Sequence, residues 1–426
     1  MRFRWFLLVS QLSVSAALAS DLSGGLTLQQ AVSIALERNR DLQFATTTIA
    51  QARAGILSAD AAPNPTLAIS TGSINLSGTN GSSSLWRKEI DTIVSINQLI
   101  ERGDKRALRT ERARQGSNAA KQDVREVRRQ LRALVAQAYA ELHAAQDRLS
   151  TLQESARLLD AALVAVQLRR DAGDVAGVDV ERVRVDGLRA QNDVTAAQAE
   201  LRRAQQQLAF LLADPDRASA LLAADDWPAP VPIVLPDRSE LLQIIDRRAD
   251  VRAASARVEG ALAGAKLAES LRTRDVAIGV QYEHFPQPPS NPNGNSIGFS
   301  VQVPLFTRYY YEGEIGASLA TLDAARIQYE QVKAAAETEI NTAASAVISA
   351  AERLRRHRDE LLQAAENSAR AAEYAYQNGA VGVMDLLDAR RTLRATRLDA
   401  LTAQVDFSKA LASWQAATET YEEEMK

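Results

Sequence analysis

Hydrophobic and polar residues alternate in two short segments of the second half of the chain, Val276–Phe285 and Ser296–Leu305. In both segments nearly every second residue is apolar, and the residues between are mostly small or polar. Successive side chains of a β-strand point to opposite faces, so this pattern predicts two strands, each with one apolar face. Weaker alternation in Thr66–Leu76 and Glu89–Leu99 predicts a second pair, which gives four strands in the chain.

Two kinds of sheet would produce this alternation. A small soluble sheet buries its apolar face against a core, whereas a strand of a membrane barrel turns that face toward lipid. A barrel needs about eight strands or more, and an open sheet edge cannot lie in lipid, so other copies of the chain would have to complete the barrel. Aromatic residues at the strand ends (Trp86, Phe285 and Tyr309–Tyr311) suit a membrane interface, although core packing explains single aromatics equally well.

Two long segments, Ser117–Ala172 and Ala317–Asn378, contain no glycine or proline. The absence of both helix breakers predicts continuous helices, which at 1.5 Å per residue would reach about 90 Å. Each segment is followed by a turn around Gly173 or Gly379 and then by a returning helix. The chain is therefore predicted to be mainly α-helical with a small β part, and its helices are much longer than those of an ordinary domain.

The order of these elements occurs twice, which indicates an internal duplication. Asp41 matches Asp250, 209 positions later, and the turn at Gly173 matches the turn at Gly379. Each half consists of a helix of about thirty residues, a strand pair, a very long helix, a turn and a returning helix. We predict two repeats, residues 20–226 and 237–426, joined by the proline-rich linker Trp227–Pro236. Chance similarity between alanine-rich helices is the alternative.

The N-terminus, residues 1–19, has the features of a secretory signal peptide. Arg2 and Arg4 precede the apolar run Trp5–Val9, and Ala17–Ala19 offers small residues for cleavage. An uncleaved N-terminal anchor is the alternative. No other segment has the eighteen or so apolar residues that a membrane-spanning helix needs. The chain contains no cysteine, so we expect neither a disulfide nor a lipid anchor attached to cysteine.

Composition argues against several functions. The formal net charge of −3, without a polybasic segment, gives no support for nucleic-acid binding. The three histidines show no ligand spacing typical of zinc or copper, so we expect neither a metal site nor a cofactor. No catalytic nucleophile stands in a recognisable setting, and no glycine-rich phosphate loop occurs. We therefore do not expect an enzyme.

Three segments of the chain resemble the TolC-type outer-membrane efflux proteins. Tyr376–Ala389 is similar to the family's turn between its last two long helices, and Arg247–Lys266 is similar to the helix that opens its second half. Gln98–Arg106 resembles the strand-to-helix junction of the cobalt–zinc–cadmium branch. The chain departs from the family pattern at Ala249, Leu99 and Asp104, where proline, proline and glycine are usual. With the duplication, the resemblance covers nearly all of the mature chain.

The resemblance implies a homotrimer, in which four strands from each copy form a twelve-stranded β-barrel in outer-membrane lipid. A long α-helical barrel would continue it across the periplasm of a Gram-negative bacterium. Such proteins are exit ducts of tripartite efflux pumps and have no enzymatic activity. A periplasmic adaptor protein and an inner-membrane transporter, here of the RND type, complete the pump. Divalent heavy-metal cations are the expected cargo, and drugs or secreted peptides or proteins are the alternative.

Two further functions stay open from the residues alone. A periplasmic adaptor also has a signal peptide and long helices. It normally contains one helical hairpin, whereas this chain has two hairpins that alternate with two strand pairs. A structural coiled-coil protein would show sustained heptads, and the long segments here are too alanine-rich and irregular for that.

The resemblance also indicates residues of a periplasmic gate. In the family, acidic side chains matching Asp385 and Asp388 point into the lumen at the closed end, and a tyrosine matching Tyr376 links neighbouring helices. Where relatives often carry a polar or basic partner in this turn, the chain has Val381. The residues themselves allow simpler roles, because Asp385 could cap its helix and Tyr376 could pack as an ordinary aromatic ring.

The hairpin tips are the expected docking place for the adaptor. Gly173 and Gly379 are predicted to end the long helices in a left-handed conformation. Apolar side chains beside them would supply the adaptor contacts: Val175, Val178, Val381 and Met384. Packing among the helices of the protein itself is the alternative.

Overall fold

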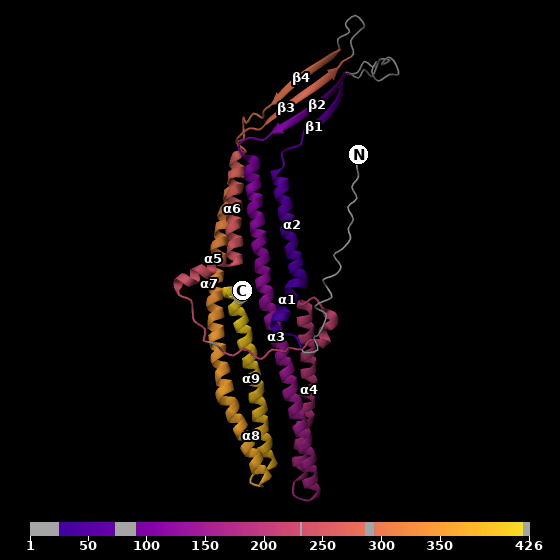
Figure 1. The fold of residues 1–426 in the computed structure, drawn as a ribbon, viewed down its shortest axis with the longest axis vertical. Helices are drawn as coiled ribbons and strands as arrows, with labels where there is room; N and C mark the ends of the chain where they lie inside the picture. The colour runs from indigo at the N-terminus through magenta and orange to yellow at the C-terminus, as the bar shows by residue number, and fades with distance from the viewer. Residues whose placement is uncertain (1–24, 73–90, 231, 286–293, 421–426) are drawn as a thin grey trace, which may run out of the picture. The chain divides into compact units, whose positions relative to one another are not determined.

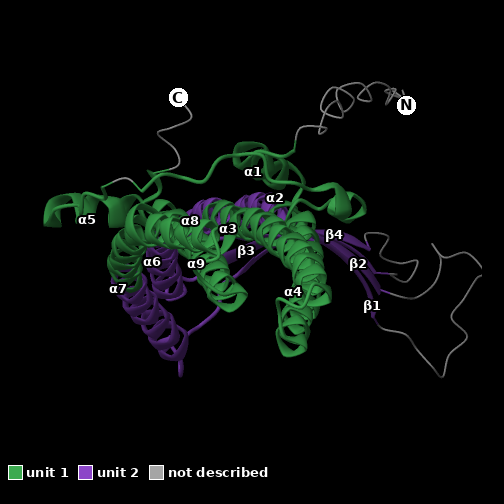
Figure 2. Cartoon of the chain, turned by 90° about the horizontal axis from the view of Figure 1, so that it is seen from below, with its two compact units in different colours: residues 1–44, 126–248, 335–426 green, residues 45–125, 249–334 purple. Residues whose placement is uncertain are grey.

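The computed structural model describes residues 25–72, 91–230, 232–285 and 294–420 (Figure 1). The chain forms two compact units, and each unit draws on both halves of the sequence (Figure 2). The first unit contains residues 1–44, 126–248 and 335–426, and the second contains residues 45–125 and 249–334. The predicted signal peptide lies outside the described residues.

The second unit contains a four-stranded antiparallel sheet with the order β1-β2-β3-β4. The strands are β1 (Thr66–Gly72), β2 (Asp91–Ile100), β3 (Val276–His284) and β4 (Asn295–Gln302). Strand β2 of the first half pairs with β3 of the second half, so both predicted strand pairs are confirmed and join in one sheet. Strand β4 ends before Pro304, which lacks the amide hydrogen that a sheet ladder needs. Trp86 and residues 73–76 of the first predicted strand lie outside the described residues.

The sheet has one apolar and one polar face, as the alternation predicts. The register places Leu67, Ile96, Val280 and Phe299 in one row across the four strands. These apolar side chains are exposed in the single chain: Phe299 is 83% exposed, and Ile297 in the next row is 70% exposed. The sheet of one chain therefore presents an uncovered apolar surface, which a soluble sheet would bury.

Helices of 10 to 67 residues make up most of the remaining described residues. They are α1 (Leu28–Arg38), α2 (Arg40–Asp60), α3 (Lys105–Asp171), α4 (Gly177–Leu211), α5 (Arg238–Arg247), α6 (Ala249–Ser270), α7 (Glu312–Arg356), α8 (Leu362–Gln377) and α9 (Val383–Thr418). A short 3₁₀ helix spans Pro215–Ala220. Helix α3 and α4 form one hairpin, and α7–α8 with α9 form the other (Figure 1). The 67 residues of α3 correspond to a length of about 100 Å.

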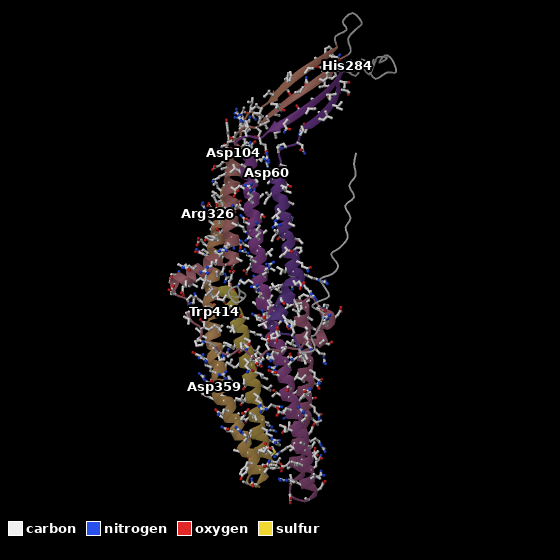
Figure 3. The ribbon with its side chains drawn as sticks, viewed as in Figure 1. Asp60, Asp104, His284, Arg326, Asp359 and Trp414 are labelled. Carbon is white, nitrogen blue, oxygen red and sulfur yellow. The ribbon has the colours of Figure 1, made fainter. Side chains whose placement is uncertain are left out.

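The loop from β2 to α3 is held by an ion pair and by left-handed backbone. Lys105 Nζ lies 2.7 Å from Asp275 Oδ1 and donates to the carbonyl oxygen of Thr273, also over 2.7 Å. Gly103 has a φ of 72°, and a Cβ there would lie 2.7 Å from the Cβ of Thr273, so glycine is required. Asp104, labelled in Figure 3, has a φ of 57°. The chain thus keeps a left-handed residue where the family usually has glycine, and aspartate is among the few other residues that tolerate it.

Each predicted thirty-residue helix is divided in two, at Asn39 and at Arg248. These residues are 209 positions apart, both are buried, and both leave the helical region with ψ of 129° and 140°. Asn39 Nδ2 donates to the carbonyl oxygen of Leu211 at the end of α4, over 3.0 Å. Arg248 Nη1 donates to that of Ala417 near the end of α9, over 3.1 Å. Each break therefore positions a polar side chain that caps the returning helix of its own half.

A π turn, His357–Leu361, joins α7 to α8, whereas the equivalent helix of the first half, α3, is continuous. The predicted long helix over Ala317–Asn378 is thus correct in extent but contains one wide turn. Asp359, labelled in Figure 3, belongs to this turn and pairs with Arg358 at its surface. Such turns interrupt the regular hydrogen-bond ladder of a helix and often lie at functional positions.

Candidate gate and docking tips

Both hairpins turn through a left-handed glycine, as predicted. Gly173 has a φ of 88° and Gly379 a φ of 72°, and nothing lies within 4 Å of a Cβ built on either. In the first turn the amide of Asp174 donates to the carbonyl oxygen of Arg169 over 2.9 Å, and the second turn has the equivalent bond. This is the Schellman pattern that ends long helices. Glycine is required here by backbone conformation and not by crowding.

The two predicted gate acids lie at the start of α9. Asp385 is exposed, and its Oδ2 accepts a hydrogen bond of 3.1 Å from the amide of Gly382. Asp388 follows one helical turn later and is also exposed, while Leu386 and Leu387 between them are buried. The carboxylates therefore share the face of α9 that points away from its packing surface. The capping role of Asp385 uses one carboxylate oxygen and leaves the acid at the surface.

Tyr376 connects the two hairpins. The guanidinium carbon of Arg169, in the last turn of α3, lies 4.7 Å from the centre of the Tyr376 ring near the end of α8. This distance is typical of a cation–π interaction, which holds a charged group over the face of an aromatic ring. Val381 stands where relatives often carry a polar or basic partner, and the partner of Tyr376 is instead Arg169 of the other hairpin, which no local pattern in the sequence indicates.

The apolar tip residues do not all face outward. A buried cluster lies just behind the tips, formed by Val166, Val180, Val183 and Leu387. Val175 and Met384 pack against this cluster and are half-buried, as is Val381. Val178 is 58% exposed. The structure therefore involves Val175 and Met384 in helix packing and leaves Val178 as the most exposed apolar side chain of this group.

Behind the cluster, ion pairs join α9 to the first hairpin. Arg394 Nη1 lies 3.2 Å from Asp193 Oδ2 of α4, and Arg397 Nη1 lies 3.3 Å from Glu154 Oε2 of α3. A third pair joins Arg391 and Asp186. The spacing of three residues among the arginines of α9 was the one signal that they form a row on one side of that helix.

Chemical sites of other kinds are not apparent in the described part of the chain. No group of three or more histidine, aspartate or glutamate residues there could hold a metal ion. None of the described helices is both long and apolar enough to cross a membrane.

The family model for outer membrane efflux proteins matches two segments, residues 31–214 and 241–418. The chain belongs to the outer membrane efflux protein family. The two matches follow each other in the two halves of the sequence, which confirms the internal duplication. Family membership also confirms the predicted resemblance and places the protein among the transport proteins of the outer membrane.

Several members of this efflux family are similar over most of their length. The cobalt-zinc-cadmium resistance protein CzcC of Cupriavidus metallidurans is 26% identical over 393 residues, which cover 89% of this chain and 86% of the relative. The cation efflux system protein CusC of Escherichia coli is 26% identical over 390 residues, covering 86% and 80%. The pyoverdine export outer membrane protein OpmQ of Pseudomonas putida is 26% identical over 430 residues, covering 92% and 87%.

Solved efflux channels share the fold. The crystal structure of CusC superposes with a TM-score of 0.78 at 22% identity, over 92% of this chain and 91% of that one. VceC of Vibrio cholerae superposes with a TM-score of 0.74 at 19% identity, over 92% and 95%. The mainly helical fold with a small sheet, predicted from the sequence, is therefore the fold of this channel family.

Proposed function

We propose that the protein is the exit channel of a tripartite efflux pump and that three copies form its pore. The observation that carries the proposal is the sheet. Four strands are too few to close a barrel, and in lipid the outer edges of β1 and β4 would leave backbone groups without partners. Three copies would supply twelve strands, pair every edge and turn the exposed apolar face toward lipid.

The proposed cargo is divalent heavy-metal cations, conducted passively. Two observations support a metal cargo: the similarity to CzcC and CusC, and the resemblance of Gln98–Arg106 to the cobalt–zinc–cadmium branch. A duct should not bind its cargo tightly, so a metal cluster is not required. Similarity to OpmQ supports the alternative, an organic cargo. Pairing of the two strand pairs in one sheet argues against a periplasmic adaptor or a structural coiled coil, and we propose no catalytic step.

The proposed gate lies at the hairpin tips. Three copies would bring the carboxylates of Asp385 and Asp388 around one periplasmic opening, where they would attract cations. The Arg169–Tyr376 contact would hold the two hairpins together in the closed state. An adaptor would dock on the turns at Gly173 and Gly379, with Val178 as its most exposed apolar contact. The inner-membrane partner would be a transporter of the RND type.

Conductance of the purified protein tests the proposal. Protein extracted from outer membranes should migrate as a trimer and should produce discrete, cation-preferring current steps in planar bilayers. A monomer in the soluble periplasmic extract, or no current at any protein concentration, would exclude a channel. Loss of tolerance to cobalt, zinc or cadmium in cells that lack the protein would support a metal cargo. If such cells keep their metal tolerance but lose tolerance to an organic compound, the cargo is organic and the proposed metal cargo is wrong.

A further inference from the structure

On the polar face of the sheet, two amide side chains lie over glycines of the next strand. The register places Asn97 opposite Gly279 and Gln281 opposite Gly298. A Cβ built on Gly279 would overlap Asn97 Oδ1 and would lie 2.5 Å from Ser300 Oγ and 3.2 Å from Asn97 Cγ. A Cβ built on Gly298 would lie 2.9 Å from Cγ and 3.1 Å from Nε2 of Gln281. Each amide thus occupies the space that a side chain on the neighbouring strand would fill.

These glycines are not required by backbone conformation. Neither Gly279 nor Gly298 is among the residues with positive φ. Strand side chains normally stand roughly perpendicular to the sheet, and a glycine inside a strand marks a place where another group approaches the backbone closely. Here the approaching group is an amide from the adjacent strand, which lies flat instead of standing upright.

The rows that contain these amides are neutral. One row runs through Thr66, Asn97, Gly279 and Ser300, and the next runs through Ala68, Ser95, Gln281 and Gly298. Asn97 Nδ2 lies 3.4 Å from Ser95 Oγ, so hydroxyl and amide groups also contact each other along the strand. The carboxylate of Glu283 stands one row further on, near Ser296. This face can hydrogen-bond to water but carries no charge in its central rows.

We infer that Gly279 and Gly298 set the width and the character of the pore inside the barrel. The inference rests on the proposed three-copy barrel, whose polar face would line the pore. Flat amides leave the pore wide and lined by neutral hydrogen-bonding groups. Such a wall exchanges hydrogen bonds with a hydration shell, and its central rows carry no carboxylate, imidazole or thiolate that would bind a heavy-metal ion firmly. The barrel would therefore pass hydrated cations without stripping their water and would discriminate by size.

Single-channel recordings of variants test the inference. Gly279→Ala would displace the amide of Asn97 into the pore, so we expect a loss of conductance and a smaller size limit for neutral polymers that enter. Gly72→Ala is the matched control, because Gly72 lies on the same face with nothing within 4 Å of its Cβ position. The double variant Asn97→Ala/Gly279→Ala removes the displaced amide and leaves only the hydroxyl of Ser300 close to the new Cβ, and a change of rotamer can move that hydroxyl aside. The double variant should therefore regain most of the wild-type conductance.

The outcomes separate this inference from the proposed function. A wild-type protein without conductance would defeat the proposed channel. If the wild type conducts and the Gly279→Ala trimer has the same conductance and size limit, the inference about Gly279 is wrong while the proposed channel stands. If the Gly279→Ala variant does not assemble, the conductance of the Asn97→Ala variant tests the inference instead. A flat amide blocks little of the pore, so its removal should leave the conductance nearly unchanged, and a fall in conductance would overturn the inference.

Discussion

Arg248, which is buried, and Glu339, which is partly exposed, form an ion pair between the α5–α6 break and α7. The Nη2 atom of Arg248 lies 2.6 Å from Oε2 of Glu339, and only 1% of the Arg248 side chain is exposed. Glu339 also accepts a 2.9 Å hydrogen bond from Nη1 of Arg129 in α3. At the equivalent position of the first half, the neutral amide of Asn39 caps the end of α4. The two halves therefore solve the same capping problem with different chemistry.

Replacing Arg248 should destabilise the first unit strongly. Arg248→Met leaves the buried carbonyl oxygen of Ala417 without its donor, while Glu339 keeps Arg129, so we expect a loss of about 2 kcal/mol. Guanidinium unfolding followed by far-UV circular dichroism measures the change. The exposed neighbour Arg247 is the matched control, and Arg247→Met should stay within about 0.5 kcal/mol of the wild type. Equal losses in the two variants would contradict a special role for Arg248.

The same pair makes stability depend on pH. Burial opposes ionisation of Glu339, but the hydrogen bonds and positive charges of Arg248 and Arg129 outweigh it and hold the pKa of this carboxyl below its ordinary value. The ionised group therefore adds stability above its unfolded pKa of about 4, and the contribution is lost as pH falls through the folded pKa. Glu339→Gln should be less stable than the wild type at pH 7, and the two should converge in acid. A gap of constant size at every pH would contradict this.

Loosening the contact between Arg169 and Tyr376 at the hairpin tips should open the proposed gate. A cation–π interaction at an exposed site is worth about 0.5–1 kcal/mol, so Arg169→Gln should raise the open fraction roughly two- to five-fold. Tyr376→Leu should act in the same direction, whereas Tyr376→Phe keeps the aromatic face and should behave like the wild type. Open probability in planar bilayers is the measurement. An equal effect of the leucine and phenylalanine variants would show that the ring itself is not the relevant partner.

Asp388 should contribute to cation selectivity without affecting the helix. Asp388→Asn removes one charge per copy from the proposed opening, so the reversal potential in a salt gradient should move toward zero. Asp385→Glu should keep both the charge and the cap at Gly382, because glutamate suits this capping position. Asp174→Asn, in the turn of the first hairpin, is the control. If it shifts the potential as much as Asp388→Asn, the selectivity comes from the tips in general.

The sequence contains local information about this fold but little about contacts between distant segments. Alternation around Phe299 predicts the strands and their apolar face, because a period of two is enough to assign faces. Left-handed turns at Gly173 and Gly379 follow from residue type. The helix break at Arg248 does not follow from residue type, because no glycine or proline marks it. The carbonyl group that Arg248 caps belongs to Ala417, 169 residues further along the chain. The partner of Tyr376 was missed for the same reason, since Arg169 belongs to the other half of the chain.

The π turn between α7 and α8 should be the least stable part of that long helix. Its wide turn weakens the hydrogen-bond ladder, and the Nδ1 atom of His357 is buried without a hydrogen-bond partner. We expect the amides of His357–Leu361 to exchange with solvent faster than those in the adjacent turns of α7. Hydrogen exchange of the assembled protein, read by mass spectrometry, measures this. The matched segment of α3 around Thr151 is continuous helix and serves as the internal control. Equal protection in both segments would mean that the π turn is as stable as regular helix and would contradict this prediction.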